Sequence, residues 1–160
     1  MEKRRRTAII FFALSIVWML FIWGNSLQPG STSGNMSGTI TEKINELLKI
    51  FGEDAELPHL FIRKAAHFLE FAALSLLLSF CAFNFFELKP TDSYARNSLS
   101  LLALPASVLV AAIDETIQLF VDGRVGAITD VLIDTSGAAM SALVFFAILV
   151  LFKRRIAKEK

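Results

Sequence analysis

Residues Leu60 to Phe86 read LFIRKAAHFLEFAALSLLLSFCAFNFF, a hydrophobic run with ionisable side chains near its start, among them Lys64, His67 and Glu70. Roughly 18 or more apolar residues are enough to cross a bilayer as a helix. A charge at the centre of such a helix costs about +2.5 to +3.5 kcal/mol, so ionisable residues inside a span mark a functional site by default. The run therefore predicts both a membrane helix and a polar site on it.

Composition places the whole chain in the membrane class. Its 160 residues are 54% hydrophobic and have a mean hydropathy of +0.57, which is too apolar for a soluble domain. Backbone groups inside a bilayer have no water to bind, so each long apolar segment is expected to be helical. We predict an all-α protein in which residues 1–160 form one membrane domain, a four-transmembrane-helix bundle with spans at 7–24, 60–86, 98–120 and 127–152.

Several classes of function find no support in the sequence. The formal net charge is +1, and the basic residues lie mostly at the chain ends, so nucleic-acid binding is not expected. Cys81 is the single cysteine, which excludes an intrachain disulfide. The sequence has no phosphate loop, dinucleotide fingerprint, nucleophile elbow or His-Glu-x-x-His motif, and we expect no cofactor.

Basic residues flank both outermost hydrophobic segments. The amino end carries Lys3 to Arg6, and residues 153–160 contain five more basic residues. The positive-inside rule places both ends in the cytoplasm, and four spans return the chain to its starting side. The link at 87–97 would then be cytoplasmic, and the first segment would be an uncleaved signal anchor.

This topology brings the intramembrane polar residues to one depth, just below the outer surface. At 1.5 Å of rise per residue, Glu70 lies only about 9 Å deeper than Lys64. The inner halves of the last three segments contain no Asp, Glu, Lys, Arg or His. The predicted polar pocket consists of Lys64, His67, Glu70, Asp114, Glu115, Gln118, Arg124, Asp130 and Asp134.

The last segment carries a polar and small-residue stripe at helical spacing. Asp130, Asp134, Gly137 and Ser141 follow one another at steps of four, three and four residues. Small residues allow membrane helices to approach closely, so we expect this stripe to face the bundle rather than lipid.

The charges of the predicted pocket do not balance. Five acids face two bases, Lys64 and Arg124, so an acid is protonated, His67 is charged, or a cation is bound.

A purely structural network is one alternative to a binding or catalytic site, although intramembrane polar contacts contribute only about 0.6 kcal/mol each on average. A metal site built from His67, Glu70 and an aspartate is another. With one histidine and no standard ligand motif, we predict no metal.

The first outer loop predicts an additional helix. Residues 30–35 follow a proline and read as a flexible linker. Thr39 and Glu42 have the spacing of a capping box, and Gly52 supplies a stop. The apolar residues between them share one side, which predicts an amphipathic interfacial helix at 39–51, lying at the outer surface or over the bundle mouth.

Three blocks of sequence resemble the VanZ-like family of small bacterial membrane proteins. RKAAHFLEF at 63–71 is similar to the family's Lys-x-x-His-Phe-x-Glu-Tyr pattern, and DETIQLFVDGR at 114–124 to its Asp-Glu-x-x-Gln-x-Phe-x-x-x-Arg run. DVLIDTSG at 130–137 is similar to Asp-x-x-x-Asn-x-x-Gly. Two positions depart from these patterns, since Phe71 replaces the tyrosine and Asp134 replaces the asparagine.

The resemblance implies a cell-envelope role in the bacterial cell membrane. In the family's founding member this role is linked to resistance against lipid-tailed glycopeptide antibiotics such as teicoplanin. Our leading hypothesis is an outer-leaflet pocket that binds an amphiphile or lipid head group. Lys64 and Arg124 would hold its anionic part, while His67 and Glu70 orient it or relay protons.

Two other functions remain open. One is a membrane enzyme acting on a lipid-linked phosphate or ester, with His67 and Glu70 or Asp114 as acid and base. The other is a small transporter, which would need a polar path through the inner half that the sequence does not show. The expected partners are membrane lipid or a lipid-tailed small molecule.

Overall fold

The computed structural model describes residues 2–52, 56–86 and 97–158, with side chains described as far as residue 152. The described residues form helices and no strands. Four helices are long and apolar enough to cross a membrane, which confirms the predicted all-α membrane fold. The elements are α1 (Glu2–Ser26), α2 (Gly30–Ile50), α3 (His59–Phe85), the short 3-10 helix η2 (Ser100–Leu102), α5 (Ala103–Gln118) and α6 (Ile128–Lys158). Of the predicted inner link at 87–97, residues 87–96 lie outside the described ranges.

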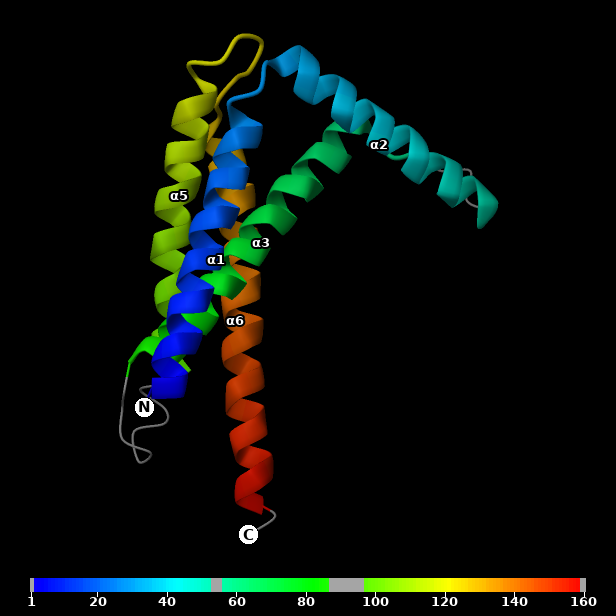
Figure 1. The fold of residues 1–160 in the computed structure, drawn as a ribbon. Coiled ribbons are helices and arrows are strands. Elements are labelled where there is room, and N and C mark those ends of the chain that lie inside the picture. The colour runs from blue at the N-terminus through cyan, green and yellow to red at the C-terminus, as the bar shows by residue number, and fades with distance from the viewer. Residues whose placement is uncertain (1, 53–55, 87–96, 159–160) are drawn as a thin grey trace.

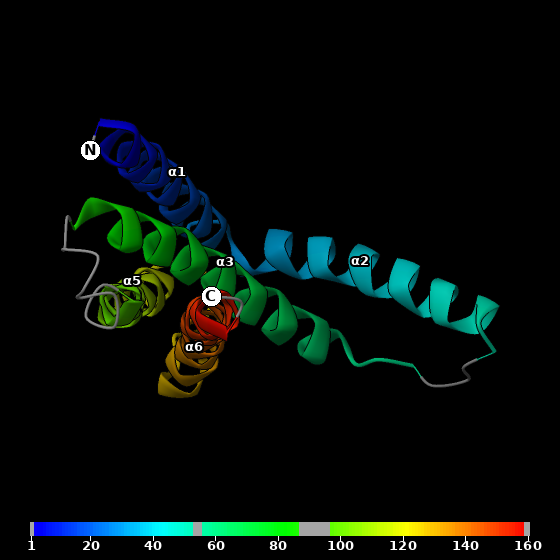
Figure 2. The same ribbon diagram turned by 90° about the horizontal axis from the view of Figure 1, so that it is seen from below.

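Helix α3 is the central element of the bundle. It packs against α1 on one side and against α5 and α6 on the other (Figure 2). The amino terminus and the carboxyl end of α6 lie at one end of the molecule, while α2 and the turn between α5 and α6 lie at the other (Figure 1). This arrangement gathers the end of α1, the start of α3, the end of α5 and the start of α6 at the α2 end.

Small residues bring α3 and α6 into close contact. A Cβ added at Gly137 would lie 2.2 Å from the carbonyl oxygen of Phe68, so a side chain at this position would force the two helices apart. About two turns further along α3, the hydroxyl of Ser75 donates to the carbonyl oxygen of Ala138, the residue after Gly137, at 2.9 Å. Gly137 of the predicted stripe therefore faces the bundle, as expected.

The apolar core is small, and the outer faces of the bundle are also apolar. Ile22, Phe71, Leu74 and Ala111 form a cluster that is fully buried between α1, α3 and α5. Many large hydrophobic side chains point outward, among them Val17 on α1, which is 64% exposed. Since lipid tails are as apolar as these side chains, such exposure is normal for helices in a bilayer.

Helix α2 differs from the helix predicted for the outer loop. It begins at Gly30, so the predicted linker at 30–35 is wrong, and Thr39 lies inside the helix instead of capping it. The Thr39 hydroxyl donates to the carbonyl of Asn35, a bond of 3.1 Å within the helix. The start is set by Pro29, whose fixed φ suits the first turn and whose carbonyl accepts from the amide of Ser33. The predicted stop is confirmed, since the helix ends at Ile50, just before Gly52 with its positive φ.

The start of α2 is tied to the turn between α5 and α6. The amide of Gly30 donates to the carbonyl of Asp122 at 3.0 Å, and a Cβ at Gly30 would lie 2.0 Å from the carbonyl oxygen of Gly123. Gly123 itself has a φ of +71°, a conformation that side chains other than glycine rarely adopt. The two glycines let these segments touch, which fixes α2 at the mouth of the bundle.

Candidate functional site

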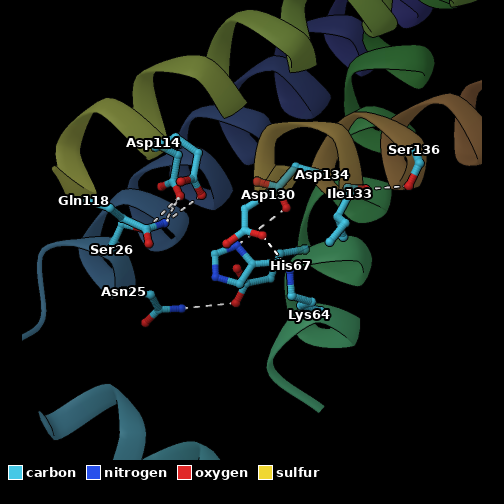
Figure 3. Close-up of polar contacts among 12 residues, drawn as sticks. Asn25, Ser26, Lys64, His67, Asp114, Gln118, Asp130, Ile133, Asp134 and Ser136 are labelled. Atoms are coloured by element: carbon cyan, nitrogen blue, oxygen red, sulfur yellow. Dashed lines mark hydrogen bonds and ion pairs between the residues drawn. The ribbon is translucent and has the colours of Figure 1, made fainter. Parts of the chain in front are cut away.

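The predicted polar residues lie at the end of the bundle beneath α2, on parts of four different elements. They come from the first turns of α3 and α6, the last turns of α5, and the turn between α5 and α6. Figure 3 shows many of these side chains pointing toward one another. In the part of α3, α5 and α6 that the structure describes up to residue 152, no Asp, Glu, Lys, Arg or His lies toward the opposite end of the bundle.

The carboxyl end of α5 carries a buried hydrogen-bond network. Asp114 is fully buried, and its Oδ2 accepts from Ser26 Oγ at 2.8 Å and from Gln118 Nε2 at 2.9 Å. The same amide nitrogen lies 3.2 Å from Glu115 Oε1. Glu115 Oε2 accepts from the backbone amide of Ala127 at 2.8 Å, just before α6 begins. The network therefore joins α5 to α1 and to the start of α6.

Two acid–base pairs join α3 to α6. Lys64 Nζ lies 2.7 Å from Asp130 Oδ1, with the two side chains 35% and 30% exposed. One turn deeper, His67 Nδ1 lies 3.5 Å from Oδ1 of Asp134, whose side chain is fully buried. Partly exposed ion pairs are worth about 1 kcal/mol or less, so the Lys64–Asp130 pair contributes little to holding the helices together.

Glu70 connects α3 to α1. Its Oε1 accepts from Asn25 Nδ2 at 3.3 Å, and its backbone carbonyl accepts from the indole nitrogen of Trp18 at 2.9 Å. Both donors belong to the carboxyl-terminal half of α1. The first helix therefore contributes to the polar region, and its end forms one wall of it.

Arg124 folds back over the end of α1 instead of pairing with the acids. Its Nε donates to the carbonyl of Gln28 at 2.9 Å and its Nη2 to the carbonyl of Asn25 at 2.6 Å. These bonds satisfy carbonyls at a helix carboxyl terminus, where a cation is favourable. Burial, together with the neighbouring Arg63, lowers the pKa of Arg124, although a guanidinium stays protonated at neutral pH.

Two cavities meet at His67. One, of about 280 Å³, lies between α1, α2 and α3 and includes Asn25, Glu70 and Arg124 in its lining. The other, of about 350 Å³, lies between α3 and α6 and includes Lys64, Asp130 and Asp134. Arg63 and His67 line both cavities.

Several residues that line the cavities or bond to the polar network lie outside the predicted pocket. Arg63 was not placed in the predicted pocket, although it stands four residues before His67, a spacing that puts the two on one face of a helix. Asn25 and Ser26 on α1 were also missed, because short polar residues at the end of a span look like ordinary helix termini. Asp114, Glu115 and Gln118 lie together as expected, while Arg124 is directed mainly at α1 carbonyls.

The fold and this polar region define a multi-pass helical membrane protein with its ionisable residues gathered at one end of the bundle. Residues 11–152 match the model of the VanZ/LLP1 family, and the chain belongs to that family. The match covers nearly the whole chain and confirms the predicted resemblance. Neither the curated proteins nor the solved structures contain a match to this sequence.

Proposed function

We propose that the cavity between α1, α2 and α3 binds the anionic head group of a cell-envelope amphiphile. The observation that carries the proposal is the mixed lining of this cavity. Phe21, Met36 and Ile40 are among its apolar residues, Arg63 and Arg124 supply two guanidinium groups, and Glu70 supplies one carboxylate. A lining that combines apolar side chains with an excess of cationic groups suits a molecule with an anionic head and a lipid tail.

The size of the cavity supports a head group rather than a whole lipid. Its volume of about 280 Å³ lies just below the usual range of small-molecule sites. An acyl tail would have to continue outside it, and α2 offers a surface for this. Met36, Ile40, Leu47 and Phe51 on or beside α2 are all at least half exposed. We infer that this apolar face lies against the lipid at the membrane surface, as interfacial helices do.

Arg63 is the best-placed group to bind an anion. Among the described residues it has no carboxylate partner, whereas the ammonium group of Lys64 is already paired with Asp130. Arginine binds phosphate and carboxylate through paired N–H groups, which suits recognition of a head group. We therefore assign the anion to Arg63 and Arg124, and not to Lys64 and Arg124 as the sequence alone suggested.

The cavity would open toward the outer leaflet. This orientation rests on the basic residues at both chain ends, which the positive-inside rule places in the cytoplasm. The polar region is at the end of the bundle opposite those ends (Figure 1). Lipid-tailed glycopeptides such as teicoplanin insert from the outside, so a protein that binds amphiphiles there would change how they reach the cell surface.

A susceptibility measurement tests this function. Cells expressing the protein should tolerate more teicoplanin than cells carrying an empty vector, and Arg63→Gln and His67→Gln should each abolish the difference. Lys43→Gln removes a charge from the exposed side of α2, outside the cavity lining, and should keep the wild-type level. All variants must accumulate equally in the membrane. Full protection by Arg63→Gln at normal abundance would contradict the proposal.

A second candidate is an enzyme that acts on a lipid-linked phosphate or ester. It is favoured by the position of His67, whose ring lines both cavities and faces a buried aspartate at 3.5 Å. A carboxylate behind a histidine orients the imidazole for proton transfer. Glu70 and Asp114 lie close enough to share that role. Incubating the purified protein with extracted envelope lipids should then give a product that His67→Gln does not form, and absence of any product would favour binding alone.

A further inference from the structure

Three side chains of the kinds that bind metals converge from three helices. One ring nitrogen of His67 on α3, one carboxylate oxygen of Asp114 on α5 and one of Asp134 on α6 all lie within 4.8 Å of one another. Asp114 and Asp134 are fully buried, and His67 is partly buried beside them. The three residues stand far apart in the sequence, so the fold alone creates this group.

Each of these three residues has at least one buried polar atom that lacks a hydrogen-bond partner. Asp114 Oδ1, His67 Nδ1 and both carboxylate oxygens of Asp134 are buried and accept or donate no hydrogen bond within the part of the chain that the structure describes. The nearest contact is the 3.5 Å separation between His67 Nδ1 and Asp134 Oδ1. Leaving buried polar atoms unpaired is costly, so they are expected to have a partner that is not a protein group.

The other oxygen of Asp114 has its partners. Its Oδ2 accepts from Ser26 and from Gln118, which fixes the carboxylate with Oδ1 directed elsewhere. Hydrogen bonds of this kind orient carboxylates that bind metals in proteins. Ser26 and Gln118 are therefore positioning residues for Asp114.

Apart from His67 itself, no basic side chain in the described ranges pairs with either of the two buried aspartates. Lys64 pairs with Asp130, and Arg124 donates to backbone carbonyls at the end of α1. Two carboxylates held this close repel each other unless a positive charge lies between them. A divalent cation at the centre of the three side chains would supply that charge and complete the missing contacts.

We propose that His67, Asp114 and Asp134 bind a divalent transition-metal ion such as Zn²⁺. One imidazole and two carboxylates form a ligand set that Zn²⁺ accepts, and three protein ligands leave a further position open. Ligand atoms lie about 2.0–2.2 Å from Zn²⁺, so the longest separations must shorten by roughly 1 Å on binding. The open position would face the cavities that His67 lines. The alternative considered from the sequence combined His67 with Glu70 and one aspartate, and here a second buried aspartate takes the place of Glu70.

The test uses the full chain, purified in detergent with any affinity tag removed and with metal stripped by a chelator. Titration with Zn²⁺ should show one ion bound per chain. Asp134→Asn, Asp114→Asn and His67→Gln should each weaken binding by at least about tenfold, since loss of a mere orienting partner already costs about 10–100-fold. His59→Gln and Asp122→Asn, which change an exposed histidine and an exposed aspartate, should bind as the wild type does.

A measurement on the wild type alone covers the case in which a variant fails to fold. X-ray absorption at the zinc edge should show a first shell of nitrogen and oxygen with the signature of a single imidazole. A stoichiometry of zero, a sulfur ligand, or unchanged binding in all three site variants would each overturn the proposal. Because the probe is Zn²⁺ without lipid, this result is independent of whether an amphiphile binds.

Discussion

The carboxylate of Asp134 on α6 lies 3.5 Å from Nδ1 of His67 on α3, and Asp134 is fully buried at this contact. Neither oxygen of Asp134 accepts a hydrogen bond among the residues described. A side chain kept only for packing would gain from being apolar or fully paired. The contact is therefore poorly suited to stabilising the fold and better suited to holding a ligand.

Asp134→Asn should stabilise the protein when metal is absent. The substitution keeps the shape of the side chain and removes a fully buried charge whose oxygens accept no hydrogen bond among the described residues. We expect the free energy of unfolding to rise by roughly 1 kcal/mol, which corresponds to a Tm higher by about 2–4 °C. Thermal unfolding of the purified protein in the presence of a chelator measures this. A lower Tm, with no change for the exposed Asp122→Asn, would show that Asp134 is a structural group.

Gly137→Ala should weaken the bundle by separating α3 from α6. The new Cβ would lie 2.2 Å from the carbonyl oxygen of Phe68, and backbone cannot yield as a flexible side chain does. Overpacking of this kind costs about 1–3 kcal/mol. The matched control is Gly24→Ala on α1, where an added Cβ meets nothing within 4 Å and alanine favours the helix. Equal Tm values for the two variants would contradict the close helix contact.

Hydrogen exchange distinguishes the observed α2 from a shorter helix. The amides of residues 34–38 are hydrogen-bonded if the helix begins at Gly30, but would exchange freely if residues 30–35 were a linker. We expect these amides to be protected as strongly as those of residues 42–48 in nanodiscs. Fast exchange confined to residues 34–38 would place the helix start near Thr39 instead.

Labelling of single cysteines tests the orientation of the bundle. In a chain carrying Cys81→Ser, a cysteine introduced by Asp122→Cys should react with a membrane-impermeant maleimide added to intact cells. One introduced by Lys3→Cys should react only after the membrane is opened, because the basic amino end is expected in the cytoplasm. The reverse pattern would place the polar region at the inner face and remove the argument for an outer-leaflet ligand.

The sequence predicted the membrane helices because hydrophobic length is a direct physical requirement of the bilayer. It also predicted that polar residues of three spans meet, since topology fixes their depth and helical spacing fixes their faces. The small-residue contact at Gly137 followed from the same spacing.

The start of α2 was mispredicted because Gly30 and Gly34 read locally as breakers. In the fold, Pro29 sets the first turn and Gly30 is needed to touch the turn at Gly123. A helix can contain glycine where tertiary contacts determine the backbone conformation. The contribution of α1 through Asn25 and Ser26 was missed for a related reason, since single polar residues become meaningful only when their partners on α3 and α5 are known.

The most direct test of the central claim is to count anionic lipids bound to the full chain by native mass spectrometry. The protein would be exchanged into nanodiscs of phosphatidylcholine containing a small fraction of phosphatidylglycerol and then released intact. Wild type and Lys43→Gln should each retain one phosphatidylglycerol, and Arg63→Gln should lose it. If Arg63→Gln retains phosphatidylglycerol as well as the wild type, or if the wild type shows no preference over phosphatidylcholine, the cavity does not bind an anionic head group.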